Sequence, residues 1–285
     1  MKIRQRVLPP GWYPGSEEET RRTIERYIAS GPAPEPSAVA GVAPHAGWAF
    51  SGRIALRVLL GFRRPLETVV VVGGHLPPSA GVLAAPEEGY ETPLGVLPAD
   101  LELLEEISGS LSAPPGEDRV PDNTVEVQLP FLKYLFPDSR ALALRAAPSE
   151  AAGELGREIR RAADSLGRTV AVLGSTDLTH YGSNYGFSPA GRGEPAVKWV
   201  KEVNDRAFIE SLLEMDGPGA LRHAGENQSA CSAGGAVAAL AYARTFGAGK
   251  GELVEYSTSY DLHPDESFVG YAGVVYRPGP SEQPG

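Results

Sequence analysis

Apolar runs rich in β-branched residues alternate along this chain with stretches of helical periodicity. Four runs predict strands, at residues 38–42, 68–72, 140–145 and 169–173. Four stretches with helical spacing or a helix-start signal predict helices, at residues 16–30, 53–62, 149–166 and 195–215. Strands that alternate with helices indicate an α/β fold around a mainly parallel sheet. The last two apolar runs, 252–257 and 268–276, predict an antiparallel edge.

Weaker signals fill the remaining segments. They predict a short strand at 82–85, a turn at 90–95, a helix at 100–107, a surface loop at 108–121 and a small-residue helix at 226–246. The Gly and Ala face of that helix would allow close packing on a neighbour. The glycine-rich segment 182–195 is typical of a lid over a pocket. Composition does not divide the chain, so we predict one domain over residues 1–277 and a flexible tail over 278–285.

Histidines follow several of the predicted strands directly. His45 comes after the strand at 38–42, His75 after the strand at 68–72, and Asp177 and His180 after the strand at 169–173. In an open parallel α/β sheet the ligand crevice lies at the carboxyl ends of the strands. We therefore expect these turns to converge on one pocket. Any one such histidine alone would be interpreted as a structural group that satisfies backbone atoms.

Imidazoles and a cysteine are suitable ligands for a transition metal. Two histidines with one anionic ligand are typical of non-haem iron(II) oxygenases and of catalytic zinc sites. Cys231 is the only cysteine, and a free cysteine is often simply a small buried hydrophobe. Its place at the predicted helix start would lower the pKa of its thiol, which makes it either a third ligand or a nucleophile.

Asp177 and His180 have the spacing of an ordinary helix cap with a histidine in the first turn. Beside a metal, the same pair would orient an imidazole or act as general acid and base. Glu126 has the spacing of a capping box with Asn123. His223 and His263 lie in polar segments and are interpreted as surface groups.

Charge and composition narrow the class of partner. The net charge of −10 argues against a nucleic-acid or anionic-membrane surface, because both require a basic face. No apolar run is long enough to span a bilayer, and the N-terminus lacks the apolar run of a signal peptide. One cysteine excludes an intramolecular disulfide. We expect a cytoplasmic protein whose partner is a small molecule, a peptide or a protein.

Several short motifs occur in the order seen in one known family. They are 11–14 (GWYP), 44–52 (PHAGWAFSG), 74–75 (GH), 90–95 (YETPLG), 125–131 (VEVQLPF), 175–181 (STDLTHY), Cys231 and 269–272 (VGYA). Together they resemble the Memo-like family, which in bacteria and archaea is also called AmmeMemoRadiSam system protein B. The resemblance covers nearly the whole chain. It departs at residues 73–75 (GGH), where the family usually has Gly-Pro-Ser/Asn-His, and at Asn123, which is commonly histidine.

The resemblance implies a single-domain α/β sandwich similar to the class III extradiol ring-cleaving dioxygenases. It implies that His45, His75 and Cys231 hold a metal, with cysteine in place of the carboxylate of those enzymes. Asp177 and His180 match further pocket residues. The family is linked to metal binding and redox chemistry, and its bacterial members to a radical-SAM partner and to AmmeMemoRadiSam system protein A.

Three functional hypotheses follow. The leading one is a metal-binding, oxidoreductase-like protein with non-haem iron(II), or else copper or zinc, and with His180 and Asp177 as catalytic groups. The second is a non-catalytic scaffold that uses a vestigial dioxygenase pocket to bind a peptide or protein. The third is zinc-dependent hydrolysis.

Overall fold

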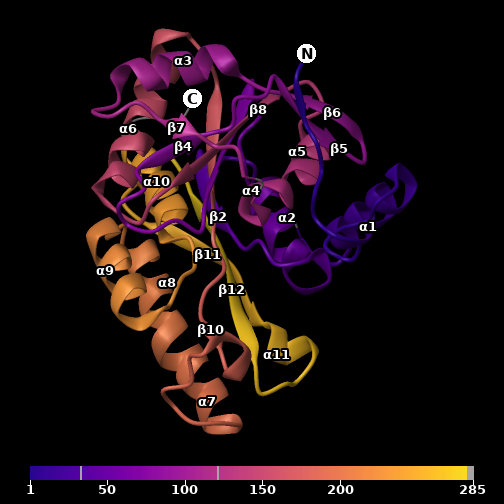
Figure 1. Ribbon diagram of the computed structural model, residues 1–285, viewed down its shortest axis with the longest axis vertical. Coiled ribbons are helices and arrows are strands. Elements are labelled where there is room, and N and C mark those ends of the chain that lie inside the picture. Colours follow the sequence, from indigo (N-terminus) through magenta and orange to yellow (C-terminus); the bar gives the residue numbers. More distant parts are fainter. Residues whose placement is uncertain (33, 121, 281–285) are drawn as a thin grey trace.

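A nine-stranded mixed sheet forms the middle layer of the molecule (Figure 1). This computed structural model describes residues 1–32, 34–120 and 122–280. The strand order is β10-β12-β2-β9-β3-β8-β4-β7, and β11 pairs with β12. The strands are β2 (Ala40–Ala43), β3 (Thr68–Gly73), β4 (Val82–Ala84), β7 (Gly116–Glu117), β8 (Arg140–Ala146), β9 (Val170–Ser175), β10 (His180–Tyr181), β11 (Gly251–Thr258) and β12 (Phe268–Tyr276).

The centre of the sheet is parallel and its flanks are antiparallel. Strands β2, β9, β3 and β8 run parallel to one another. Their residues are almost entirely buried, as expected for strands covered on both faces. Strand β12 runs antiparallel to β2, β10 and β11, and β4 runs antiparallel to β8. The predicted α/β fold and its antiparallel edge are confirmed.

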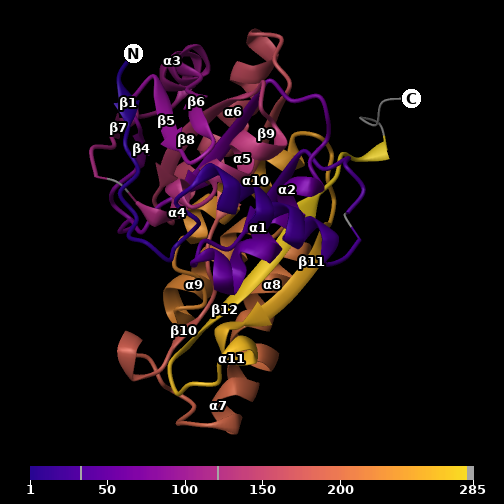
Figure 2. The same cartoon turned by 90° about the vertical axis from the view of Figure 1, so that its right-hand side faces the viewer.

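Helices cover both faces of this sheet (Figures 1 and 2). One layer contains α3 (Leu101–Ser110), α6 (Glu150–Ser165), α8 (Asp205–Leu213), α9 (Gly217–Asn227) and α10 (Ala233–Arg244). The other contains α1 (Glu17–Ala29), α2 (Arg53–Leu60), α4 (Asn123–Glu126) and α5 (Leu129–Leu135). Alternate residues of the central strands face opposite layers, so Val70 and Val72 join one apolar core and Val69 and Val71 the other. The result is the predicted sandwich.

A second, three-stranded sheet was not predicted. It is formed by β1 (Ile3–Arg4), β5 (Gly89–Thr92) and β6 (Gly95–Pro98). The expectation of only a turn at 90–95 was wrong, because this segment is a hairpin. Gly95 has φ +99°, a conformation that favours glycine, and it begins the returning strand β6.

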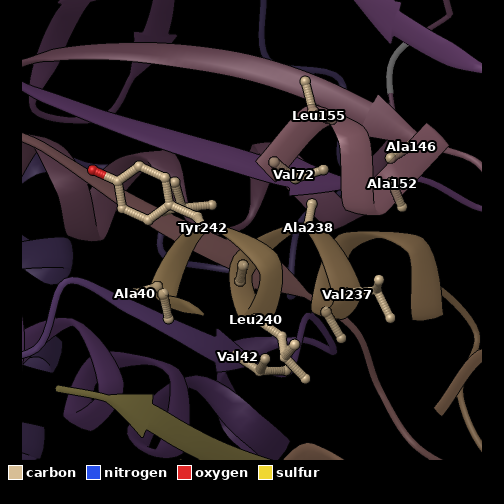
Figure 3. Packing of buried hydrophobic residues seen from close by; sticks show 14 of the residues in the cluster. Ala40, Val42, Val72, Ala146, Ala152, Leu155, Val237, Ala238, Leu240 and Tyr242 are labelled. Carbon is tan, nitrogen blue, oxygen red and sulfur yellow. The ribbon is translucent and has the colours of Figure 1, made fainter. Parts of the chain in front are cut away.

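Helix α10 packs very closely on the sheet (Figure 3). A Cβ at Gly235 would lie 2.2 Å from the carbonyl oxygen of Val72, so only glycine fits there. The predicted close packing of a small-residue helix is confirmed, but its predicted start was wrong. Helix α9 ends at Asn227, Gln228 takes a left-handed conformation with φ 48°, and α10 begins only at Ala233. Cys231 therefore lies in the loop between two helices.

Other boundaries differ in detail. The helix expected at 195–215 is present as α7 (Glu194–Trp199), a π-helical turn (Val200–Asn204) and α8. The loop expected at 108–121 contains the last turn of α3 and strand β7, while residue 121 lies outside the described residues. In the expected tail, Gly279 N–H donates to the Phe246 carbonyl oxygen at 2.8 Å. Residues 281–285 lie outside the described residues. None of the helices in the described ranges has the length and apolar character that a bilayer span requires.

Candidate metal centre

Three neighbouring parallel strands deliver the predicted site residues to one edge of the sheet. Strand β9 lies between β2 and β3, and each of the three ends just before a site residue: His45, His75 or Asp177. The His45 and His75 rings meet edge to face with centroids 5.1 Å apart. The predicted convergence of the strand ends is confirmed, and the shortened Gly73-Gly74 turn does not prevent it.

Cys231 joins these histidines from the loop before α10. Its Sγ lies 3.2 Å from His45 Nε2. The Cys231 N–H donates to the Asp177 carbonyl oxygen at 3.3 Å, which fixes the loop against the end of β9. One ligand atom from each of His45, His75 and Cys231 lies within 4.8 Å of the other two. His45 is buried, Cys231 is half-buried and His75 is exposed, so one side of the group faces solvent.

This arrangement fits a transition-metal ion. Metal–nitrogen and metal–sulfur bonds to zinc are about 2.0 and 2.3 Å long, which places donors on one tetrahedral ion roughly 3.5 Å apart. The separation of 3.2 Å between Cys231 Sγ and His45 Nε2 is close to that value, and the three ligand atoms all lie within 4.8 Å of one another. Two imidazoles and one thiolate suit iron, copper or zinc better than a hard cation such as magnesium.

Each histidine has a second polar contact that sequence reasoning missed. Ser175 Oγ lies 3.3 Å from His45 Nδ1, and Asp122 Oδ2 lies 3.6 Å from His75 Nδ1. Both contacts engage Nδ1, which leaves each Nε2 available to a metal. Ser175 could have been noticed as the last residue of the strand before Asp177. Asp122 directly precedes the helix start that the sequence predicts at Asn123.

Burial changes the proton affinity of the candidate ligands His45 and Cys231. Burial and the neighbouring His75 lower the pKa of His45 to about 3, so its imidazole is neutral and can act as a ligand. Burial and the nearby Asp177 raise the pKa of the Cys231 thiol, contrary to the lowering expected from a helix start. The physical reason is that Cys231 lies ahead of α10 in the loop and beside a carboxylate. A bound cation reverses this effect, because it stabilises the thiolate directly.

Asp177 and His180 lie at the same end of the sheet but do not form a helix cap. His180 belongs to strand β10, so the interpretation as a first-turn histidine was wrong. Asp177 is buried, and its Oδ1 accepts the His45 N–H at 2.7 Å. Burial raises the pKa of Asp177 against the opposing effect of His180. His180 Nδ1 lies 3.1 Å from the Leu178 carbonyl oxygen, so this backbone group sets its tautomer, rather than Asp177.

Residues in and next to α4 donate hydrogen bonds to the backbone of the turn that carries His45. Asn123 donates to the His45 carbonyl oxygen at 3.4 Å, and Gln128 donates to the Pro44 carbonyl oxygen at 2.8 Å. The helix cap is Asp122, which accepts the Thr124 N–H. The capping-box interpretation of Glu126 was therefore wrong. The Glu126 carboxylate instead accepts hydrogen bonds from Val7 N–H, Leu8 N–H and the Tyr13 hydroxyl, which ties the N-terminal segment to the site.

The group formed by His45, His75 and Cys231, called the metal group below as a candidate site, opens into a cavity of about 600 Å³, called the histidine pocket below. His45, His75, Asp177 and His180 line it together with residues from distant segments, including Trp12, Phe50, Tyr185, Ser259, His263 and Asp265. His263 is exposed, as expected of a surface group, but it also lines this pocket. His223 lies elsewhere, with Nδ1 2.7 Å from Ser229 Oγ. Trp48 stacks on Phe131 with ring centroids 3.8 Å apart and is a packing residue.

The fold and the site define an α/β sandwich with a His-His-Cys group at the carboxyl edge of its sheet. The chain matches the model of the Memo-like protein family over residues 4–275. It is 34% identical to a MEMO1 family protein of Pyrococcus abyssi, over 84% of this chain and 86% of that protein. It is 33% identical to a MEMO1 family protein of Thermococcus kodakarensis, over 96% and 99% of the two chains. The chain belongs to the Memo-like family.

Proposed function

We propose that this protein binds a redox-active transition metal through His45, His75 and Cys231 and acts as a non-haem, oxidoreductase-like protein. The observation that carries the proposal is the grouping of three ligand atoms within 4.8 Å of one another at the mouth of a cavity. Iron(II) is the proposed metal, and copper and zinc are the alternatives. A small molecule entering the histidine pocket is the proposed substrate, with chemistry related to that of the extradiol dioxygenases.

In this proposal His180 accepts a proton, and Asp177 stabilises charge and positions the His45 turn. When bound, iron or copper would supply a change of oxidation state that none of the side chains provides. His180 donates through Nδ1–H to the Leu178 carbonyl, which leaves Nε2 to accept a proton from a ligand. Burial lowers the pKa of His180, and the Asp177 carboxylate opposes this effect by favouring the positive charge that His180 then carries. Asp177 also holds the His45 turn by accepting the His45 N–H.

The proposed partners rest on the family resemblance alone. A radical-SAM enzyme and AmmeMemoRadiSam system protein A are proposed to act with this protein. The exposed side of the metal group at His75 is compatible with a macromolecular partner as well as with a small substrate.

Metal analysis tests the proposed function. Protein purified without oxygen is analysed by mass spectrometry for iron, copper and zinc, in wild type, His45→Ala and Cys231→Ala. His223→Ala is the matched control, because its imidazole lies outside the histidine pocket. We expect near-stoichiometric iron or copper in wild type and the control, and loss of most of it in the two ligand variants.

The same analysis distinguishes the other hypotheses. Zinc alone, retained in air, would contradict the redox proposal and favour hydrolysis. Absence of metal from wild type, or equal metal in the ligand variants, would contradict the ligand assignment and favour a scaffold. Oxygen uptake with catechols, measured on the metal-loaded protein, then tests the dioxygenase-like chemistry.

A further inference from the structure

The charged groups of the histidine pocket are all acidic apart from its histidines. Among the described residues that line it there is no lysine or arginine, whereas Asp177 and Asp265 both contribute. Asp177 lies at the buried end beside His45, and Asp265 is exposed in the loop between α11 (Ser259–Leu262) and β12. Strand β10 and helix α11, which flank this part of the pocket, lie at the same end of the molecule in both ribbon views (Figures 1 and 2).

The charge of Asp265 is not compensated by the rest of the site. A divalent ion would be offset by the Cys231 thiolate and the Asp177 carboxylate, so the inner end of the pocket would be close to neutral. Asp265 Oδ1 accepts the Ser267 N–H at 3.1 Å, a local contact that does not neutralise it. Within residues 1–32, 34–120 and 122–280, no ion pair involves Asp265, whereas the adjacent Glu266 pairs with Arg192 at 3.4 Å.

Aromatic side chains line the same pocket as these two carboxylates. Trp12, Phe50 and Tyr185 contribute to the pocket. The Tyr185 ring lies edge to face against His180 with centroids 4.9 Å apart. Burial, then Asp177 and Asp265, raise the pKa of Tyr185, so its phenol stays neutral and both carboxylates act on this ring. Aromatic faces beside a carboxylate attract ammonium groups, whereas a carboxylate or phosphate would be repelled.

We propose that the histidine pocket selects an aromatic small molecule that carries an ammonium group, which Asp265 and the aromatic side chains bind at the pocket mouth. A ligand with a carboxylate or phosphate in that place is disfavoured. This inference depends on the proposed function at one point, because the charge of a bound metal would offset the charges of the Cys231 thiolate and the Asp177 carboxylate. The acidic and aromatic side chains are present in either case.

A matched pair of ligands tests this selection. Dopamine and 3,4-dihydroxyphenylacetate share a catechol ring and differ in an ammonium or a carboxylate at the end of the side chain. Phenethylamine and phenylacetate are the corresponding pair without the metal-binding hydroxyls. Binding is measured by calorimetry without oxygen and at low salt, on wild type, Asp265→Asn and Glu266→Gln. Glu266→Gln removes a neighbouring carboxylate that does not line the pocket. Metal content is determined on every sample.

We expect wild type and Glu266→Gln to bind the amine of each pair about tenfold more tightly than the acid, as expected for a cation beside aromatic faces and one carboxylate. Asp265→Asn should reduce that preference to about threefold, and added salt should weaken it. Equal binding of amine and acid, a preference for the acid, an unchanged preference in Asp265→Asn, or no binding of either pair would overturn the proposal. If wild type purified without oxygen contained no metal but still preferred the amine, the missing metal would contradict the proposed function. The amine preference would still support this inference.

Discussion

Two cavities share the segment 9–11, which contributes to the wall of both. The larger one, about 930 Å³, is called the arginine pocket here because Arg6, Arg22 and Arg26 line it. It has no histidine among its described lining residues. The histidine pocket is smaller, about 600 Å³, and has four histidines but no described arginine or lysine.

The difference follows from where each cavity lies on the fold. The arginine pocket is formed by the N-terminal segment, α1 and the turn before α2, outside the large sheet. Its charges are partly paired, as with Arg6 and Glu91 at 3.5 Å. The histidine pocket lies at the carboxyl ends of β2, β9 and β3, where side chains from separate strands converge. Position on the sheet, rather than cavity size, therefore distinguishes the cavity that contains the candidate metal centre.

Replacement of one of two glycines in α6 by alanine should give the largest difference in stability and in the histidine pocket. Both glycines lie in α6, but a Cβ at Gly156 would lie 2.3 Å from the Ala238 carbonyl oxygen of α10, whereas one at Gly153 meets only Arg157 Nη1 at 3.5 Å. Gly156→Ala should displace α10, and with it the Cys231 loop, and lower the free energy of unfolding by about 2 kcal/mol. Gly153→Ala should raise it by about 0.7 kcal/mol, since alanine favours a helix.

Urea unfolding of the metal-free variants measures this effect, and metal titration measures its consequence for the histidine pocket. Because only Gly156→Ala would displace α10 and the Cys231 loop, we expect metal affinity to fall in that variant and not in Gly153→Ala. Equal stability of the two variants would contradict the described packing of α6 on α10.

Asp122→Asn is expected to have a smaller effect on metal binding, and it also removes the ion pair between Asp122 Oδ2 and Arg145 Nε at 3.6 Å. Asparagine preserves the helix cap that Asp122 provides to Thr124, but it removes the negative charge facing His75 Nδ1. The contact with His75 and the hydrogen bonds to Thr124 hold the pKa of Asp122 below its usual range in spite of burial, so the lost group is an anion. Metal affinity should fall about tenfold, as for other partners of ligating histidines.

Competition with a chelator of known affinity measures that loss. Glu91→Gln is the matched control, since it removes a carboxylate from the arginine pocket. If Asp122→Asn kept wild-type affinity, or if Glu91→Gln lost as much, Asp122 would have no role in orienting His75.

The sequence allowed the sheet and the three strand-end residues to be predicted, because both depend on local patterns. Short β-branched runs predict strands, and a histidine directly after such a run lies at the carboxyl end of that strand. This placement does not depend on contacts with distant segments. The sequence predicts Cys231 at a helix start rather than in a loop, because the Gly and Ala residues around it give no sign that Gln228 adopts a left-handed conformation.

The remaining site residues depend on contacts between distant segments. Ser175 and Asp122 acquire their roles only when β9 and α4 pack beside β2 and β3. Asp265 and His263 reach the pocket from the loop before the last strand, some 80 residues after His180 in the chain. No periodicity or spacing within one segment encodes such contacts.

Extended X-ray absorption fine structure, measured on the bound metal, tests the central claim most directly. With His45, His75 and Cys231 as ligands, wild type should show one sulfur scatterer at about 2.3 Å beside nitrogen scatterers at about 2.0 Å. Cys231→Ser should lose the sulfur contribution and keep the nitrogens. A wild-type spectrum with only nitrogen and oxygen neighbours, or an unchanged spectrum in Cys231→Ser, would contradict the assignment of this metal centre.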